Sequence, residues 1–352
     1  MRKIQEADVK NKKVLVRVDF NVGLAEGKVK ESFKIASAKE TVDYLLNRGA
    51  KVALMSHLGR PAAVKTLAGD PTGKIDPEFS LRQIVSDAEI ILSEKITFIS
   101  DCTGVAVKEA LDSLNDGVLL LENVRFYPGD EANDENFARQ LAENFDLFVN
   151  DAFSASHRDH ASVTGVAKLL PSYAGLRLQE EIHEMNIVKD HPVHPAVAII
   201  GGAKIETKLP VIQFFEEKYD HILVGGKIAN EAADQKMQFS QKVVLPVDLA
   251  KDRFDIGAQT IEKYKQVISG AKTIVWNGPM GKFEEKPYDT GTNEVLSAVI
   301  KSGAYVLMGG GESVEILEEQ NVMDKISFVS TGGGAMLEYL SGNPMPGIEV
   351  LK

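Results

Sequence analysis

Two glycine-rich turns near the C-terminal end of the sequence have the composition of a phosphate-binding site. They are residues 309–311 and 332–334, and each follows a short apolar run and precedes a segment with the pattern of a helix. Glycine allows the backbone to turn tightly and to approach a ligand closely. The N-terminus of the following helix offers unpaired N–H groups and a positive dipole end to an anion. One such turn could simply reverse the chain, but two on adjacent parallel strands would form a single anion cradle.

A second set of residues suited to anion binding follows apolar runs in the first half of the chain. The guanidinium fork matches phosphate and carboxylate groups, although a single arginine at a strand end is most often part of a surface salt bridge. Three arginines together with a histidine favour a site for a small, multiply charged anion. The polar residues of this set are Asp19, Asn21, His57, Arg60, Arg125 and Arg158.

In the second half, two lysines follow an apolar run and a Gly-Gly pair. Lys204 and Lys208 have the i, i+4 spacing, so on a helix they would share one face and both ammonium groups could reach the same phosphate chain. A solvated lysine pair is the alternative. Asn277 ends another apolar run, and Glu284, which follows a proline-containing turn, could accept a hydrogen bond from a ribose hydroxyl or face water.

The elements that would position these residues alternate along the chain. Short apolar runs typical of buried parallel strands are separated by helix-period segments, one of which has Asn133 as its expected N-cap. The alternation predicts an α/β fold with two doubly wound, Rossmann-like parallel sheets, whose strands end on one edge beside the polar residues. The expected strands are residues 13–18, 51–56, 96–100, 117–122, 147–151, 196–202, 221–226, 242–248, 271–279, 305–311 and 326–334.

The length of 352 residues is large for one domain. A long polar helix pattern, ended by Pro192 and Pro195, marks the expected boundary. We expect an N-terminal domain at residues 1–175, an interdomain hinge helix at 176–192 and a C-terminal domain at 193–340.

The composition argues against several classes of protein. The net charge of −11 is unlike that of a general nucleic-acid or membrane-surface binder. The sequence has no apolar run of about 18 residues and no apolar secretory signal at its N-terminus. The single cysteine, Cys102, rules out an internal disulfide and fits a reducing compartment. We therefore expect a cytoplasmic protein with no nucleic-acid or membrane partner.

Several motifs are missing as well. GxxxxGK[ST], HRD and DFG do not occur, and no GxGxxG follows the first strand, which argues against a P-loop NTPase, a protein kinase and a Rossmann dehydrogenase. The histidine pairs at 157/160 and 191/194 lack further ligands at zinc spacing. Two anion sites on two α/β domains indicate phosphoryl transfer between a small acid and a nucleotide, which depends on positioning and charge neutralisation.

The sequence also resembles a known family. The motifs VRVDFN, SHLGRP, LLLENVRF, VNDAF, GGAK, WNGPMG, GGG and STGGGA occur in the order seen in the phosphoglycerate kinase family, over nearly the whole chain. The resemblance implies reversible transfer of the acyl phosphate of 1,3-bisphosphoglycerate to MgADP, giving 3-phosphoglycerate and MgATP. It also implies a monomer, hinge closure that excludes water, and a C-terminal tail, about residues 341–352, that returns to the N-terminal domain.

The resemblance implies roles for individual residues. Those expected to hold the phosphoglycerate are Asp19, Asn21, Lys34, His57, Arg60, Arg125 and Arg158. Those expected to hold the nucleotide are Gly202, Ala203, Lys204, Lys208, Gly226, Asn277, Glu284, Gly309, Gly310, Gly311, Glu312 and Ser313, with Glu312 also at Mg²⁺. Those expected to act on the transferred phosphoryl group are Lys34, Lys204, Gly310 and Gly333.

The sequence departs from the family pattern at three places. Lys34 stands where the family has an arginine, so the charge is kept without the planar fork, and Glu312 replaces an aspartate. The chain is also shorter, with the missing parts expected at residues 230–242 and 248–255, which border the base pocket. An active kinase is the leading interpretation. The alternatives are a catalytically weak binding or regulatory relative and a nucleotide-dependent dehydrogenase, which the lack of GxGxxG disfavours.

Overall fold

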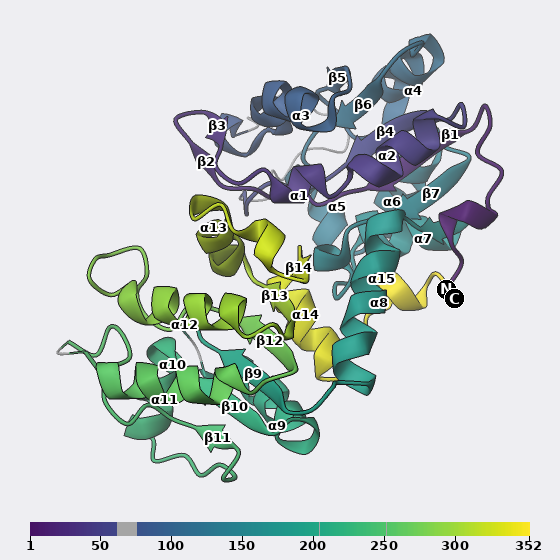
Figure 1. The fold of residues 1–352 in the computed structure, drawn as a ribbon. Helices are drawn as coiled ribbons and strands as arrows, with labels where there is room; N and C mark the ends of the chain where they lie inside the picture. Colours follow the sequence, from purple (N-terminus) through teal and green to yellow (C-terminus); the bar gives the residue numbers. More distant parts are fainter. Residues whose placement is uncertain (62–75, 204, 251) are drawn as a thin grey trace. The chain divides into compact units, whose positions relative to one another are not determined.

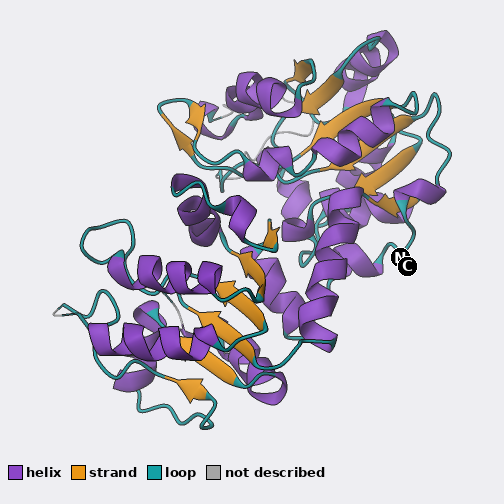
Figure 2. Ribbon diagram, in the orientation of Figure 1, coloured by secondary structure: helices purple, strands orange, loops and turns teal. Residues whose placement is uncertain are grey.

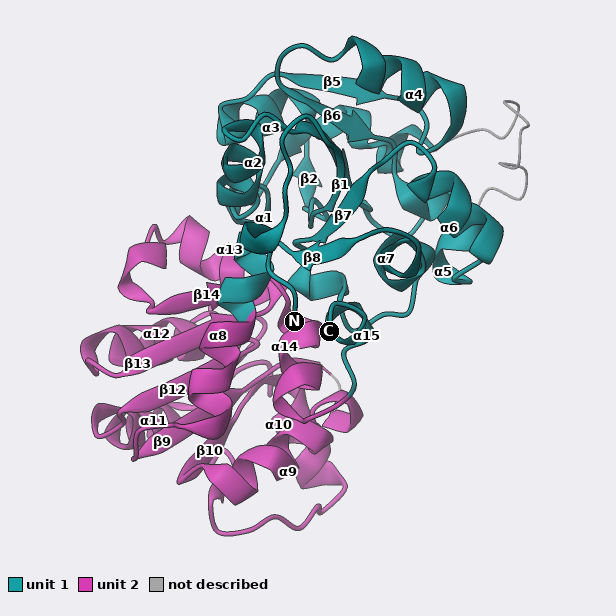
Figure 3. Cartoon of the chain, turned by 90° about the vertical axis from the view of Figure 1, so that its right-hand side faces the viewer, with its two compact units in different colours: residues 1–181, 344–352 teal, residues 182–343 magenta. Residues whose placement is uncertain are grey.

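A computed structural model describes residues 1–61, 76–203, 205–250 and 252–352. The chain forms two compact units, residues 1–181 with 344–352 and residues 182–343, shown in two colours in Figure 3. In the described part of the chain, no helix has the length and apolar character needed to cross a membrane.

The first unit is built on a six-stranded sheet with the order β5-β6-β4-β1-β7-β8, in which every pairing is parallel. Helices cover both faces of this sheet (Figures 1 and 2). The strands are β1 (Lys13–Arg17), β4 (Lys51–Met55), β5 (Ile96–Ile99), β6 (Val118–Leu121), β7 (Leu147–Asn150) and β8 (Ser172–Ala174). The helices are α1 (Phe33–Ala36), α2 (Lys39–Leu46), α3 (Val85–Leu92), α4 (Gly104–Ser113), α5 (Pro128–Glu131), α6 (Glu135–Ala142), α7 (Val166–Leu169) and α15 (Pro346–Glu349).

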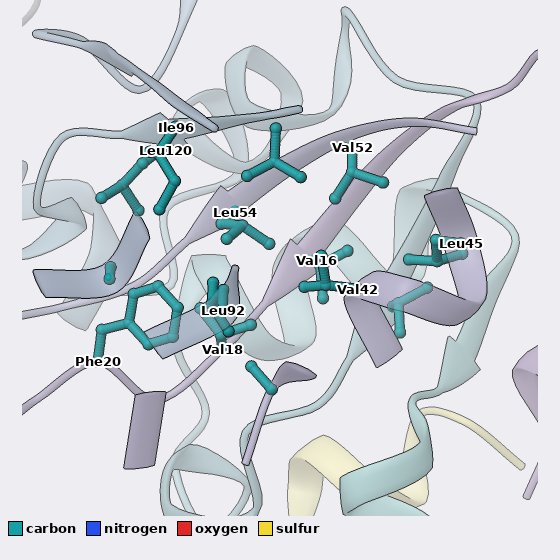
Figure 4. Packing of buried hydrophobic residues seen from close by; sticks show 14 of the residues in the cluster. Val16, Val18, Phe20, Val42, Leu45, Val52, Leu54, Leu92, Ile96 and Leu120 are labelled. Carbon is teal, nitrogen blue, oxygen red and sulfur yellow. The ribbon is translucent and has the colours of Figure 1, made fainter. Parts of the chain in front are cut away.

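Alternating side chains of the central strands build a core on each face of this sheet. Val14 and Val16 of β1 pack into one core, with side chains of α2 and α3; Figure 4 shows Val16 beside Val42 and Leu54. Leu15, between them, packs into the other core with side chains of α4, α6 and α7. Burial on both faces explains why these strands read as unbroken apolar runs in the sequence.

The second unit repeats the architecture with the order β11-β10-β9-β12-β13-β14, again with parallel pairings. The strands are β9 (Ala196–Ile200), β10 (His221–Val224), β11 (Val243–Val244), β12 (Thr273–Asn277), β13 (Tyr305–Gly309) and β14 (Phe328–Ser330). The helices are α9 (Leu209–Lys218), α10 (Gly226–Asp234), α11 (Ala258–Ser269), α12 (Thr290–Lys301), α13 (Gly311–Glu319) and α14 (Gly333–Leu340). The division between the units falls within α8 (Leu176–Asp190).

The predicted α/β fold with two parallel sheets is confirmed, with differences in detail. Sequence reasoning did not foresee β8 or the small antiparallel hairpin of β2 (Leu24–Ala25) and β3 (Lys28–Val29). Asp134, not Asn133, is the N-cap of α6: its side chain accepts the N–H of Phe137, while Asn133 has a φ of +50°.

The C-terminal segment packs within the first unit, where the two chain ends lie side by side (Figure 1). The N–H of Arg2 donates to the carbonyl of Leu351 at 2.8 Å, and Asn150 Nδ2 donates to the carbonyl of Gly347 at 3.0 Å. The first hydrogen bond connects the tail to the start of the chain, and the second connects it to the end of β7.

Candidate active site

Three of the predicted arginines meet at one cavity in the first unit. The cavity has a volume of about 370 Å³ and is lined by Arg60, Pro61, Arg125, Glu131, Arg158 and His160. Its side chains come from the loops after β4, β6 and β7, as expected for parallel strands that end on one edge. Burial, followed by repulsion from Arg125 and Arg60, lowers the pKa of Arg158. The cavity is therefore a concentrated positive site in an acidic protein, suited to a small anion with more than one charge.

Arg125 is anchored from its backbone. It lies in a short 3-10 turn, Val124–Phe126, where the Asn123 side chain accepts the Arg125 N–H at 3.0 Å. The Nδ2 of Asn123 donates to the carbonyls of Leu58 and Phe79 at 2.7 and 2.8 Å, which ties the turn to the loops after β4. The backbone position of Arg125 is thus set by a hydrogen-bonded turn.

Asp19, Asn21 and Lys34 form a second group at the end of β1. Asp19 Oδ2 accepts from Ser154 Oγ at 2.5 Å, and Lys34 Nζ lies 3.6 Å from the same oxygen. Lys34 also donates to the carbonyl of Asn21 at 2.8 Å, and Asn21 Oδ1 accepts the Gly59 N–H at 2.8 Å. These contacts link the loops after β1, β4 and β7, so all three predicted residues are placed by the edge of the sheet.

His57 has a partner that sequence reasoning missed. Arg17, the last residue of β1, is 1% exposed, and its Nη2 lies 3.0 Å from His57 Nδ1. Burial, then the charges of Arg17, Arg125 and Arg158, lower the pKa of His57 well below its ordinary value. Because a guanidinium can only donate, His57 Nδ1 is the acceptor and Nε2 carries the proton. The available signal was a charged residue at the end of an otherwise apolar strand.

In the second unit the two glycine turns touch. A Cβ built on Gly333 would lie 2.4 Å from the Cα of Gly310, and Gly310 has a φ of +119°. Asn277 connects them, since its Nδ2 donates to the carbonyls of Gly309 at 2.8 Å and Gly333 at 3.4 Å. Ser313 Oγ accepts the N–H of Gly278 at 3.1 Å. The first turns of α13 and α14 are therefore held as one cradle at the ends of β12, β13 and β14.

Lys208 lies beside this cradle, where its Nζ donates to Asn277 Oδ1. Burial lowers the pKa of Lys208 to about 8, and the carboxylate of Glu312 opposes that shift. Lys208 is the residue before α9 and follows a 3-10 turn, Ile205–Thr207. The predicted pairing of the two lysines on one helix face stays a prediction. Lys204 itself lies outside the described residues.

A cavity of about 480 Å³ opens near Glu312 in the second unit. Five of its lining residues are predicted nucleotide-binding residues: Gly202, Ala203, Gly226, Glu284 and Glu312. The others include residues of the two segments expected to border the base pocket; they are Lys227, Asn230, Glu231, Asp234, Asp252, Arg253, Phe254, Pro279, Gly281 and Lys282. Gly226 has a φ of +67°, and a Cβ there would meet the Gly202 nitrogen at 2.8 Å. The two glycine positions therefore allow the loops after β9 and β10 to pack closely at the edge of the cavity.

The acidic residues at this cavity bear on metal binding. Burial and the nearby Glu284 raise the pKa of Glu312. Among the described residues there is no group of three or more metal-binding side chains. One or two carboxylates with substrate phosphates are the usual environment of Mg²⁺ in phosphoryl-transfer sites, so Glu312 fits an ion that arrives with a nucleotide.

Comparisons with known proteins show the family to which the chain belongs. The phosphoglycerate kinase family model matches residues 4–244 and 231–343. The chain belongs to the phosphoglycerate kinase family. It is 40% identical to the phosphoglycerate kinase of Bartonella quintana, with 100% of this chain and 99% of that protein covered, and 40% identical to that of Rubrobacter xylanophilus, with 99% and 98% covered. The leading interpretation of the sequence, a glycolytic kinase, is confirmed.

Solved structures of the family have the same fold. The phosphoglycerate kinase of Coxiella burnetii aligns with a TM-score of 0.80 at 33% identity, covering 99% of this chain and 98% of that one. The enzyme of Pyrococcus horikoshii aligns with a TM-score of 0.87 at 26% identity, covering 100% and 98%.

The comparisons also locate the shortening. The alignment with the Bartonella quintana protein runs over 402 positions, so at least 50 of them (402 − 352) have no residue in this chain. The family model matches in two pieces that overlap at residues 231–244, which coincides with most of the first segment where residues were expected to be missing. That segment begins within α10, and Asn230 and Asp234 of it line the cavity of the second unit.

Proposed function

We propose that the chain transfers the acyl phosphate of 1,3-bisphosphoglycerate to ADP, and that 3-phosphoglycerate and ATP are the products. The observation that carries this proposal is the convergence of Arg60, Arg125 and Arg158 on one cavity. Such a cavity suits a small acid with several negative charges, and the touching glycine turns of the second unit suit the phosphate chain of a nucleotide.

Each unit would contribute to a different part of the reaction. The arginine cavity, with Asp19, Asn21 and His57 beside it, would hold and orient the phosphoglycerate. The backbone N–H groups of the glycine turns would stabilise the charge of the phosphoryl group during transfer, because preorganised donors act most strongly where water is excluded. Transfer in line would require closure of the two units during turnover.

Charged side chains would complete the catalytic set. Lys34 and Lys204 would neutralise the phosphoryl group, and Lys208 with Asn277 would bind the nucleotide phosphates. Glu284 would accept from the ribose. Glu312 would hold Mg²⁺ together with the nucleotide phosphates, where the ion would neutralise phosphate charge.

We further propose that the protein works in the cytoplasm as a monomer, with no nucleic-acid or membrane partner. The net charge of −11 supports the last point. The base of the nucleotide would lie in the cavity of about 480 Å³, beside Phe254, whose side chain is half exposed.

The test is steady-state phosphoryl transfer from ATP to 3-phosphoglycerate in the presence of Mg²⁺, coupled to reduction of the product. Turnover supports the proposal. Lys34→Arg is assayed beside the parent, because arginine restores the bidentate fork, and loss of one transition-state donor costs on the order of 10² to 10³ in rate. We expect the variant to be about tenfold faster or more in kcat.

The outcomes separate the alternatives. An unchanged rate in Lys34→Arg would show that the Lys34 ammonium, at 2.8 Å from the Asn21 carbonyl, neutralises the phosphoryl group as well as an arginine would. Binding of 3-phosphoglycerate without turnover in either protein would overturn the proposal in favour of a binding or regulatory relative.

A further inference from the structure

Arg125 has two carboxylate partners, and they differ in how easily each could leave. Glu131 Oε1 lies 2.7 Å from Arg125 Nη1, and Asp130 Oδ2 lies 3.8 Å from Arg125 Nε. The Asp130 side chain is fully buried, whereas that of Glu131 is 61% exposed. Arg125 itself is only 7% exposed. The guanidinium is therefore fixed between one enclosed carboxylate and one at the surface.

Asp130 cannot leave this position at low cost. Its Oδ1 accepts the Ser162 N–H at 3.0 Å, and its Oδ2 also lies 3.9 Å from His160 Nδ1. Moving a charged carboxylate out of such a buried, hydrogen-bonded place would leave Arg125 without compensation. Asp130 thus balances the charge of Arg125 whether or not the cavity holds an anion.

Glu131, in contrast, lines the cavity itself, beside Arg60 and Arg158. It is the last residue of α5, whose first turn begins with Pro128. The local backbone therefore carries the Glu131 side chain to the mouth of the cavity, while its exposure allows the side chain to turn into solvent. Its carboxylate forms a close ion pair with Nη1, at the place where a phosphate or carboxylate oxygen of a substrate would bind.

We propose that Glu131 is a displaceable internal competitor, which occupies Arg125 Nη1 in the free protein and must release it when a phosphorylated acid enters the cavity. This inference rests on the proposed function for the identity of the acid, but not for its charge. Without an anion, Glu131 reduces repulsion within the arginine cluster. With one, it lowers the affinity, so Glu131 sets how tightly and how selectively the cavity holds multiply charged ligands.

The test is Glu131→Gln in the full chain, with binding measured by titration calorimetry for inorganic phosphate and for 3-phosphoglycerate. Glutamine keeps the shape of the side chain and removes its charge. Because the Glu131 partner of this ion pair is largely exposed, the pair is worth little in itself, and we expect both ligands to bind about two- to fivefold more tightly. The expected gain is larger at low salt, because exposed charges are screened.

Glu135→Gln is the matched control. Glu135 lies four positions further along the chain, is 87% exposed, and pairs with Arg139 at 3.6 Å on α6 without lining the cavity. Glu135→Gln removes the same charge as Glu131→Gln, so any gain in affinity that it produces reports only the change in net charge. The gain of Glu131→Gln must exceed it, and thermal unfolding of both variants checks that each is folded.

Each remaining outcome decides the matter. Equal or weaker binding by folded Glu131→Gln overturns the inference, and a loss of binding would show that Glu131 positions Arg125. A gain for inorganic phosphate with no binding of 3-phosphoglycerate would support the inference while refuting the proposed function. Failure of the parent and the variant to bind either ligand would overturn both.

Discussion

Nucleotide binding should weaken as the pH rises through the pKa of Lys208. Burial lowers that pKa to about 8, so in the free protein the ammonium form dominates at pH 7.5 and the neutral amine at pH 9. A bound phosphate chain favours the ammonium form, because a nearby opposite charge raises the pKa of a lysine. The sign is therefore fixed: above pH 8, ADP binding requires the uptake of a proton, and its affinity falls.

The magnitude follows from the fraction of charged lysine. With a pKa of about 8 in the free protein, roughly three quarters of Lys208 side chains are charged at pH 7.5 and about one tenth at pH 9. If bound phosphate moves the pKa above this range, the affinity for ADP falls about eightfold, or about 1.2 kcal/mol. The phosphates of ADP do not contribute, since their last ionisation lies near pH 6.

The assay is titration calorimetry of ADP, without added Mg²⁺, between pH 7.5 and 9. Buffers with different ionisation enthalpies report the proton taken up, which should approach one at pH 9. Lys208→Arg is the control because arginine stays charged throughout, so its affinity should be nearly constant. Binding of 3-phosphoglycerate, for which we propose guanidinium groups, should also stay constant. Constant ADP affinity in the parent, or an equal decline in Lys208→Arg, would refute the reasoning.

Two further predictions concern stability, and both are measured by urea unfolding. Gly333→Ala should lower the free energy of unfolding by about 1–3 kcal/mol, because its Cβ would meet Gly310 Cα at 2.4 Å. Gly334→Ala is the control and should be neutral or stabilising, because no atom lies within 4 Å of the added Cβ. Equal effects of the two changes would contradict the contact between the turns. Burial raises the pKa of Asp151 to about 6, against an ordinary value of 3.8. The protonated Asp151 therefore stabilises the fold fully below about pH 4, and this stabilisation of up to about 3 kcal/mol is lost as the pH rises through about 6. Asp151→Asn should remove that part of the pH dependence, and an identical pH profile in the parent and the variant would show that Asp151 does not cause it.

The sequence carries the parts of the fold and the site that depend on local patterns. Strands buried on both faces are largely apolar, so β1 and β9 were recognisable as runs. Arg60, Arg125 and Arg158 could be placed together because each follows such a strand, and parallel strands end on the same edge. Gly310 and Gly333 could be placed together for the same reason.

Other features depend on contacts between distant segments and left no local signal. In the sequence, Arg17 is one more residue of a strand. Its role becomes visible only in the structure, where His57, in the loop after another strand, lies 3.0 Å from it. The shift of the α6 N-cap from Asn133 to Asp134 depends on the left-handed backbone at Asn133, which residue type alone does not decide, since both residues cap helices well. The start of α9 at Leu209, with a proline in its first turn, was not predicted either.

An arginine-rich cavity in a protein with a net charge of −11 is no contradiction. Beyond a Debye length of about 8 Å, the field of exposed charges is largely screened, so the cavity responds to its immediate neighbours and not to the sum over the chain. Two of those neighbours differ in burial. The Asp130 side chain is fully buried and stays beside Arg125, while the Glu131 side chain is exposed and can turn into solvent. A buried carboxylate stabilises the empty site without competing for the ligand, because its oxygens do not enter the cavity. An exposed one adds stability to the empty site only by opposing the ligand. The affinity of such a site is therefore adjusted through the exposed partner, and the integrity of the fold through the buried one.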